Sequence, residues 1–96
     1  MWLIHRERIQ EFIGFHSDSA SSLVAWARNM ETNIFTNPVA IKKTFGSADY
    51  VKPYWVFNIS GNKYRLIALI DFALKTVSVE FVLVHAEYDK NKWRKK

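Results

Sequence analysis

The chain has 96 residues, of which 49% are hydrophobic and 16% aromatic, and it carries a formal net charge of +5 with no cysteine. This size predicts one domain spanning 1–96, the apolar content excludes an intrinsically disordered chain, and the lack of cysteine excludes disulfides, thiol catalysis and cysteine-ligated metals. Because no apolar run reaches about 18 residues and the amino terminus lacks the order of a signal peptide, we expect a cytoplasmic protein that does not enter a membrane.

The amino-terminal half is predicted to be mainly helical, after an apolar stretch over 1–5 that favours a short strand. A first helix is predicted over 6–15, because its apolar positions recur at helical spacing. Asp18 or Ser19 is expected to cap a second helix. The apolar stripe of that second helix consists of Leu23, Trp26, Ala27, Met30 and Ile34.

The rest of the chain is predicted to be rich in strands. A short helical turn over 39–45 and a loop over 46–53 come first, and β-branched and aromatic residues then dominate. Strands are predicted over 54–60, 63–72 and 77–84, and three consecutive strands imply an antiparallel meander. The expected fold class is therefore α+β, with amino-terminal helices packed on an antiparallel sheet in the order β-α-α-β-β-β.

The burial pattern also predicts the register of these strands. If Gly61-Asn62 forms a two-residue turn, Ser60 lies opposite Lys63 in the first hairpin. For the second hairpin, a four-residue loop over 73–76 makes the core face uniformly apolar. The pairs that this loop implies are Phe72 with Val77, Ile70 with Val79, Ala68 with Phe81, and Leu66 with Leu83. The opposite face is expected to stay open, with an exposed apolar patch formed by Val56, Ile67, Leu69 and Val82.

Basic residues are concentrated in the carboxy-terminal tail, 90–96. Five of the 14 basic residues of the chain lie there, namely Lys90, Lys92, Arg94, Lys95 and Lys96. Such a tail is typical of a segment that binds a polyanion, because each neutralised phosphate releases condensed counterions. The tail can equally serve solubility alone, and Trp93 within it can stack on a base or dock on the domain.

Histidine and glycine positions argue against a metal or nucleotide cofactor. The three histidines, His5, His16 and His85, include no pair at the i, i+4 spacing that would place two ligands on one helix face. The carboxylates near His85 lack a second nitrogen ligand, and the glycines stand alone rather than in a phosphate-cradling loop. We therefore expect neither a metal site nor a cofactor.

The most informative residues form two segments, VFNISGNKYRL at 56–66 and HAEYDK at 85–90. In this order and separation they resemble the paired signatures of the HigB family, a branch of the RelE-like toxins of bacterial toxin–antitoxin pairs. Weaker similarity in the amino-terminal half extends the resemblance over most of the chain. Departures from the usual family residues occur at Ser17, Leu69 and Val84, and they make the expected open face less polar.

The resemblance implies a RelE-like small domain that cleaves mRNA on the translating ribosome. It also implies a partner, a HigA-type antitoxin with a helix-turn-helix DNA-binding domain, so that operator DNA is contacted only through the antitoxin complex. The corresponding chemistry is attack of a ribose 2′-hydroxyl on the adjacent phosphate, which needs a base, an acid and a stabiliser of the phosphorane charge but no metal.

Residues of the two segments are assigned to these roles. Arg65 is the candidate phosphate stabiliser, because its planar fork matches two phosphate oxygens, although a surface salt bridge is the alternative. His85 is the candidate base or acid, because histidine titrates near neutrality, and a structural histidine at a strand end is the alternative. Tyr88 is a candidate proton donor, phosphate contact or stacking ring, or simply a packing aromatic. The candidate RNA contacts are Asn62, Lys63, Lys90, Lys92 and His16.

Two other functions are compatible with the same residues. The basic tail and the open face also suit an RNA- or ribosome-binding module without catalysis. The apolar patch on that face also suits a protein-interaction domain, and an antitoxin helix or arm is one partner that it would receive. Cleavage assays separate the first alternative from a nuclease, and the second overlaps with antitoxin binding.

Overall fold

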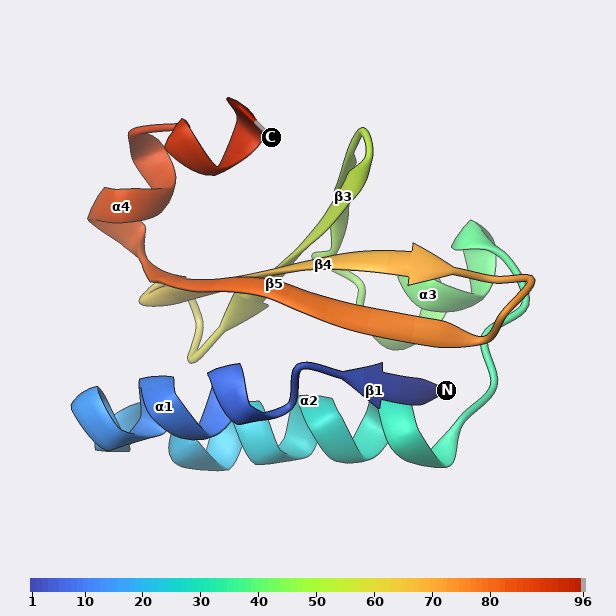
Figure 1. Cartoon of the computed structure of the whole chain (residues 1–96), viewed down its shortest axis with the longest axis horizontal. Helices are drawn as coiled ribbons and strands as arrows, with labels where there is room; N and C mark the ends of the chain where they lie inside the picture. Colours follow the sequence, from blue (N-terminus) through green and yellow to red (C-terminus); the bar gives the residue numbers. More distant parts are fainter. Residues whose placement is uncertain (96) are drawn as a thin grey trace.

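A five-stranded mixed sheet, with strand order β1-β5-β4-β3-β2, lies between two helical layers (Figure 1). This computed structural model describes residues 1–95. The elements are β1 (Trp2–Ile4), α1 (Glu7–Phe15), the 3-10 helix η1 (Ser17–Ser19), α2 (Ala20–Thr32), α3 (Pro38–Thr44), β2 (Asp49–Val51), β3 (Tyr54–Ile59), β4 (Tyr64–Asp71), β5 (Thr76–Val84), α4 (His85–Asp89) and the 3-10 helix η2 (Lys92–Lys95). None of the helices in this described part combines the length and apolarity needed to cross a bilayer.

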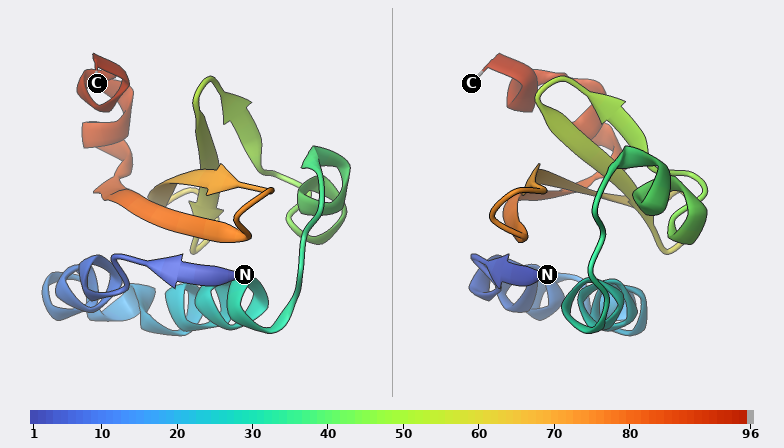
Figure 2. Two further views of the ribbon diagram at one scale, coloured as in Figure 1. Left: turned by 45° about the vertical axis from the view of Figure 1, so that its right-hand side comes forward. Right: turned by 90° about the vertical axis from the view of Figure 1, so that its right-hand side faces the viewer.

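The layers confirm the predicted α+β class and the central antiparallel meander. Helices α1 and α2 cover one face of the sheet, and α4 with η2 lies beyond the other face (Figure 2). The sheet is larger than the meander, because β1 joins its edge in parallel to β5 and β2 pairs antiparallel to β3. The loop predicted over 46–53 was thus wrong at Asp49–Val51, where pairing with β3 overrides the weak local strand signal.

The start and end of α2 differ from the prediction. Ser19 occupies the cap position, but its hydroxyl donates to the His16 carbonyl at 2.6 Å and makes no cap bond. The Asp18 carboxylate bonds to side chains of the sheet end instead. Ile34 lies beyond the last residue of the helix and is 64% exposed, so the predicted apolar stripe ends at Met30.

The predicted register of the first hairpin is confirmed. Trp55 pairs with Ala68 and Ile59 with Tyr64, and the backbone N–H of Lys63 donates to the Ser60 carbonyl. Gly61 has a φ of 67°, in the left-handed region that glycine adopts without strain. The side chains of Trp55, Phe57 and Ile59 lie in the core beneath the helices.

The predicted register of the second hairpin was wrong. Ile70, rather than Phe72, pairs with Val77, and Ala68 pairs with Val79. Ile67, which precedes Ala68 in β4, pairs with Phe81. Glu80 therefore has no partner residue in β4 and is an extra residue in β5. The prediction assumed unbroken alternation, whereas this β-bulge reverses the facing of every residue after it.

The bulge changes what the second face of the sheet contains. Phe81 and Leu83 turn away from the helices and pack against a second apolar cluster, built around Val56, Ile67 and Trp93. Val56 and Ile67 are 2% and 0% exposed. The exposed patch predicted for this face was therefore wrong, because the carboxyl-terminal segment covers it. Val82, the fourth member predicted for that patch, faces the helices instead.

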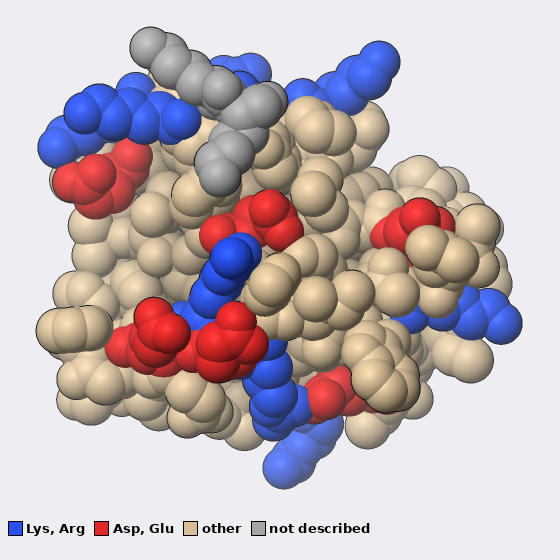
Figure 3. Space-filling model, in the orientation of Figure 1, with Lys and Arg blue, Asp and Glu red and all other residues tan. Residues whose placement is uncertain are grey.

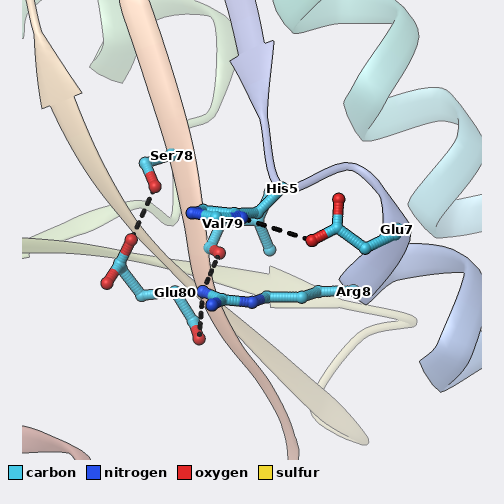
Figure 4. Close-up of polar contacts among 6 residues, drawn as sticks. All are labelled: His5, Glu7, Arg8, Ser78, Val79 and Glu80. Carbon is cyan, nitrogen blue, oxygen red and sulfur yellow. Dashed lines mark hydrogen bonds and ion pairs between the residues drawn. The ribbon is translucent and has the colours of Figure 1, made fainter.

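The carbonyl groups of the bulge are held by α1 (Figure 4). Arg8 Nη1 donates to the Val79 carbonyl at 2.8 Å and lies 3.3 Å from the Glu80 carbonyl. The Ser78 hydroxyl donates to the Glu80 carboxylate at 2.6 Å on the same strand. A bulge removes ladder partners from the backbone, and a half-buried carbonyl left without a donor is costly, so Arg8 stabilises this break in the sheet.

We predict that Arg8→Met lowers the free energy of unfolding by about 1–3 kcal/mol, because the bulge carbonyls lose their donor while the apolar stem of the side chain is kept. For a domain of this size the melting temperature falls by roughly 4–8 °C per kcal/mol. Thermal and urea unfolding measure the loss. The control is Arg28→Met on the exposed side of α2, and equal stability of the two variants would contradict the role given to Arg8.

Candidate functional site

The two segments singled out in the sequence meet at one end of the sheet. The β3–β4 turn presents Asn62 and Lys63, and β5 ends beside it, where Val84 pairs with Tyr64. The backbone N–H of His85 donates to the Lys63 carbonyl at 3.1 Å. Candidate residues that are more than twenty positions apart in sequence therefore surround one corner of the molecule.

Arg65 is buried at this corner, with 7% of its surface exposed. Its Nη1 donates to the carbonyls of Asn62 at 3.2 Å and Tyr64 at 3.0 Å, and its Nη2 donates to Asn62 Oδ1 at 3.0 Å. The guanidinium also lies over the Tyr88 ring, 5.3 Å from the ring centroid. Every one of these partners is neutral, and no carboxylate in residues 1–94 forms an ion pair with Arg65.

His85 is the first residue of α4, and its side chain is exposed. Strand pairing ends at Val84, so His85 lies beyond the sheet. Its Nδ1 lies 2.8 Å from Asp89 Oδ2, one helical turn further on. Such a bond favours the tautomer with a proton on Nδ1 and leaves Nε2 available for proton transfer. Asp89 is one of the carboxylates near His85 for which the sequence indicated no role other than that of a metal ligand.

Tyr88 connects the site to the carboxyl-terminal segment. Its ring stacks on Trp93 with 5.3 Å between centroids and 13° between planes. The Trp93 Nε1 donates to the Tyr88 carbonyl at 3.0 Å, and Trp93 is 4% exposed. Of the two alternatives left by the sequence, Trp93 therefore docks on the domain, and Arg65, Tyr88 and Trp93 form one column.

A second polar group lies on the helix side of the same sheet end. Asp18 accepts hydrogen bonds from the Tyr64 hydroxyl at 2.7 Å and from Lys63 Nζ at 2.9 Å. These two bonds lower the pKa of Asp18, and the same contacts raise the pKa of Lys63 and of Tyr64. The His16 ring stacks on Phe12 and lies 5.4 Å from the Tyr64 ring. Asp18 was missed as a site residue, because its sequence position indicated only a helix cap.

The remaining candidates lie in the carboxyl-terminal segment. Lys90 is exposed and pairs with Glu87 at 3.1 Å, and Lys92 is exposed beside Trp93. Figure 3 shows basic and acidic side chains next to one another over α4, with further basic side chains along the adjoining edge. The predicted basic tail extends to Lys96, which lies outside the described residues. Within those residues no three His, Cys, Asp or Glu side chains gather as metal ligands.

Comparisons with known proteins identify relatives over most of the chain. Residues 19–91 match the family HigB_toxin, described as the RelE-like toxic component of a toxin-antitoxin system. The mRNA interferase toxin HigB of Escherichia coli K12 is 28% identical over 92 residues, which cover 93% of this chain and 88% of that protein. The mRNA interferase HigB of Shigella flexneri is similar to the same extent, with 28% identity over 93% of this chain and 88% of its own length.

We predict that Asp18→Asn destabilises the protein in a way that depends on pH. The pKa of Asp18 is lowered in the folded state, so its ionised form stabilises the fold near neutral pH, and this contribution is lost as pH falls through the lowered pKa. The variant should be less stable than the wild type between about pH 5 and 8, and the two should converge toward roughly pH 2.

Urea unfolding at a series of pH values measures this difference. Asp49→Asn serves as the control, because Asp49 is an exposed carboxylate away from the sheet end. A difference between wild type and Asp18→Asn that stays constant down to acidic pH would mean that the ionised carboxylate contributes nothing.

Proposed function

The chain belongs to the HigB toxin family of RelE-like toxins, and from this membership and the site geometry we propose that it is an endoribonuclease that cuts mRNA. The proposed reaction is attack of a ribose 2′-hydroxyl on the adjacent phosphate, which leaves a 2′,3′-cyclic phosphate and a free 5′-hydroxyl. This reaction fits a toxin, because a cleaved transcript is no longer translated into complete protein. The relatives named above supply the substrate class.

The observation that carries the proposal is the buried positive charge of Arg65. Buried charges in proteins are normally paired, because removing an ion from water is costly. Arg65 is held instead by carbonyl and amide oxygens and by the face of an aromatic ring, which satisfy N–H groups without neutralising the charge. A phosphate is the anion that the guanidinium fork fits, and a charge fixed in place before the reaction stabilises a phosphorane effectively.

Proton transfer is assigned to the two neighbouring residues. His85 Nε2 takes the proton from the 2′-hydroxyl, while Asp89 holds Nδ1 and stabilises the imidazolium that forms. The Tyr88 hydroxyl gives a proton to the departing 5′-oxygen and regains one from solvent. Base, acid and charge stabiliser are then all side chains, so the proposed cleavage is independent of metal ions.

Contacts to the rest of the RNA backbone surround this centre. Lys63 exchanges Asp18 for a phosphate when RNA binds, and His16 offers a ring edge on the same side. Asn62 acts on the RNA mainly by holding Arg65, and it is exposed enough to contact the backbone as well. Lys90 and Lys92 bind phosphates on the other side of the corner, where attraction to a polyanion is sequence-independent.

Membership of a toxin–antitoxin family implies an antitoxin partner. We propose that this antitoxin is of the HigA type, with a helix-turn-helix domain, and that operator DNA is bound only by the toxin–antitoxin complex. We also propose that cutting takes place on translating ribosomes in the cytoplasm, where the mRNA substrate is found. The mixed charges around the corner suit both rRNA contacts and an acidic antitoxin segment.

Arg65→Lys tests the phosphate stabiliser. The substitution keeps the positive charge but removes the bidentate fork, so we expect cleavage to fall about ten- to a thousandfold. The measurement is primer-extension mapping of cellular transcripts after induction, accompanied by a thermal melt of the purified protein. Arg94→Lys is the matched control at an exposed arginine. Wild-type cleavage by Arg65→Lys would remove Arg65 from the site, and loss of cleavage together with a collapsed melt would make it a structural residue.

His85→Gln tests proton transfer. Glutamine keeps a polar side chain of similar size but does not accept and release a proton, so cleavage should drop on the order of a hundredfold or more while RNA binding and antitoxin binding persist. His5→Gln, at an exposed histidine paired with Glu7, is the control and should cut like the wild type. Activity is measured on naked RNA in the presence of a chelator, and separately in cells. Equal activity of the two variants in these assays would contradict the role of His85.

A further inference from the structure

A pocket of about 200 Å³ lies between β5 and the carboxyl-terminal segment, next to the proposed cleavage centre. Its apolar floor is formed by Phe81 and Leu83, which reach this face because of the bulge in β5. The Trp93 side chain closes one wall. Glu87 and Lys92, one acidic and one basic, form the rim.

The pocket is placed within reach of the phosphate proposed to bind Arg65. Leu83 pairs with Arg65 across the β4–β5 ladder, and the Trp93 wall stacks on the Tyr88 ring that lies under the guanidinium. Each of the two contacts along this column spans 5.3 Å.

We propose that this pocket binds one unpaired base of the RNA, adjacent to the cut bond, and that Glu87 reads its hydrogen-bonding edge. The inference rests on the proposed function, since the ligand is the RNA to be cut. An apolar floor accepts the face of any base, and Lys92 at the rim neutralises the neighbouring phosphate. A purely apolar ligand would make no polar contact with either charged residue of the rim.

Glu87 gives the pocket a preference among bases. Its Oε1 accepts from Lys90 Nζ at 3.1 Å, and its Oε2 has no hydrogen-bond partner within residues 1–94. A carboxylate oxygen only accepts, so it pairs with the exocyclic amino groups of adenine, cytosine and guanine. Uracil has one donor on this edge, N3–H, and the carbonyl oxygens on both sides of it repel the carboxylate, so uracil is disfavoured. The pocket therefore discriminates against uracil.

The test measures binding without cleavage. Short 2′-O-methyl oligoribonucleotides of adenine, cytosine and uracil, equal in length, cannot be cut because the attacking hydroxyl is blocked. Fluorescence anisotropy with the purified full-length chain should give roughly three- to tenfold tighter binding of the adenine and cytosine oligomers than of the uracil oligomer. Glu87→Gln should reduce this ratio to about one, because an amide donates to uracil as well as accepting from the amino bases.

Glu11→Gln is the matched control, because it removes the same charge from an exposed position on α1. General relief of repulsion strengthens binding of all three oligomers in both variants and leaves the ratio between bases unchanged. Retention of the wild-type ratio in Glu87→Gln, or absence of any base preference in the wild type, would overturn the proposal. If Glu87→Gln instead weakens the antitoxin complex and leaves the base ratio intact, the pocket binds protein and the proposal is wrong.

This experiment separates the pocket from the proposed nuclease activity. A chain that cuts RNA but binds all oligomers equally keeps its proposed function and loses the base pocket. A chain that discriminates through Glu87 but does not cut RNA keeps the pocket and loses the proposed function. Leu83→Phe, which adds volume to the pocket floor, gives a second measurement and should weaken binding of the adenine and cytosine oligomers.

Discussion

The bulge at Glu80 is the constraint on which the rest of the structure depends. Before it, Val77 and Val79 face the helices, and after it Phe81 and Leu83 face the opposite side of the sheet. One extra residue thus gives a single strand two apolar faces in succession. The interruption persists because Arg8 supplies a donor to the carbonyls that the ladder no longer satisfies. A helix that is remote in sequence therefore determines which residues β5 presents at the site.

The second apolar face created by the bulge explains why the carboxyl-terminal segment folds back. Trp93 packs into it and stacks on Tyr88, and that ring lies against Arg65. Water is thereby excluded from most of the guanidinium, and the effective dielectric around its charge falls. The same packing that stabilises the domain therefore strengthens the interaction of Arg65 with an anion that reaches it. Stability and the proposed chemistry share one set of contacts.

The opposite side of the sheet end is organised by hydrogen bonds rather than by apolar packing. Asp18 ties the start of the α2 region to Lys63 and Tyr64 of the hairpin. The turn that carries Asn62 is consequently fixed from both faces of the sheet. Asp18 binds Lys63, the residue next to Asn62, and Arg65 binds Asn62 directly. Fixed turn geometry matters for catalysis, because a stabilising group that is already in place needs no reorganisation when charge develops.

Local patterns in the sequence determined the helices α1 to α3, the three central strands and the register of the first hairpin. They did so because helical spacing, strand alternation and a two-residue Gly61-Asn62 turn are properties of neighbouring residues. The same segments supplied the candidates Arg65, His85 and Tyr88 through resemblance to a family. Tertiary structure alone decided the rest. The bulge depends on Arg8, which is about seventy residues away, and the two partners of Asp18, Lys63 and Tyr64, lie more than forty residues further along the chain. The burial of Arg65 depends on the docking of Trp93 on a sheet face that the prediction, with its unbroken alternation, left open. Such features could not be predicted, because contacts between distant elements leave no periodic pattern in the sequence.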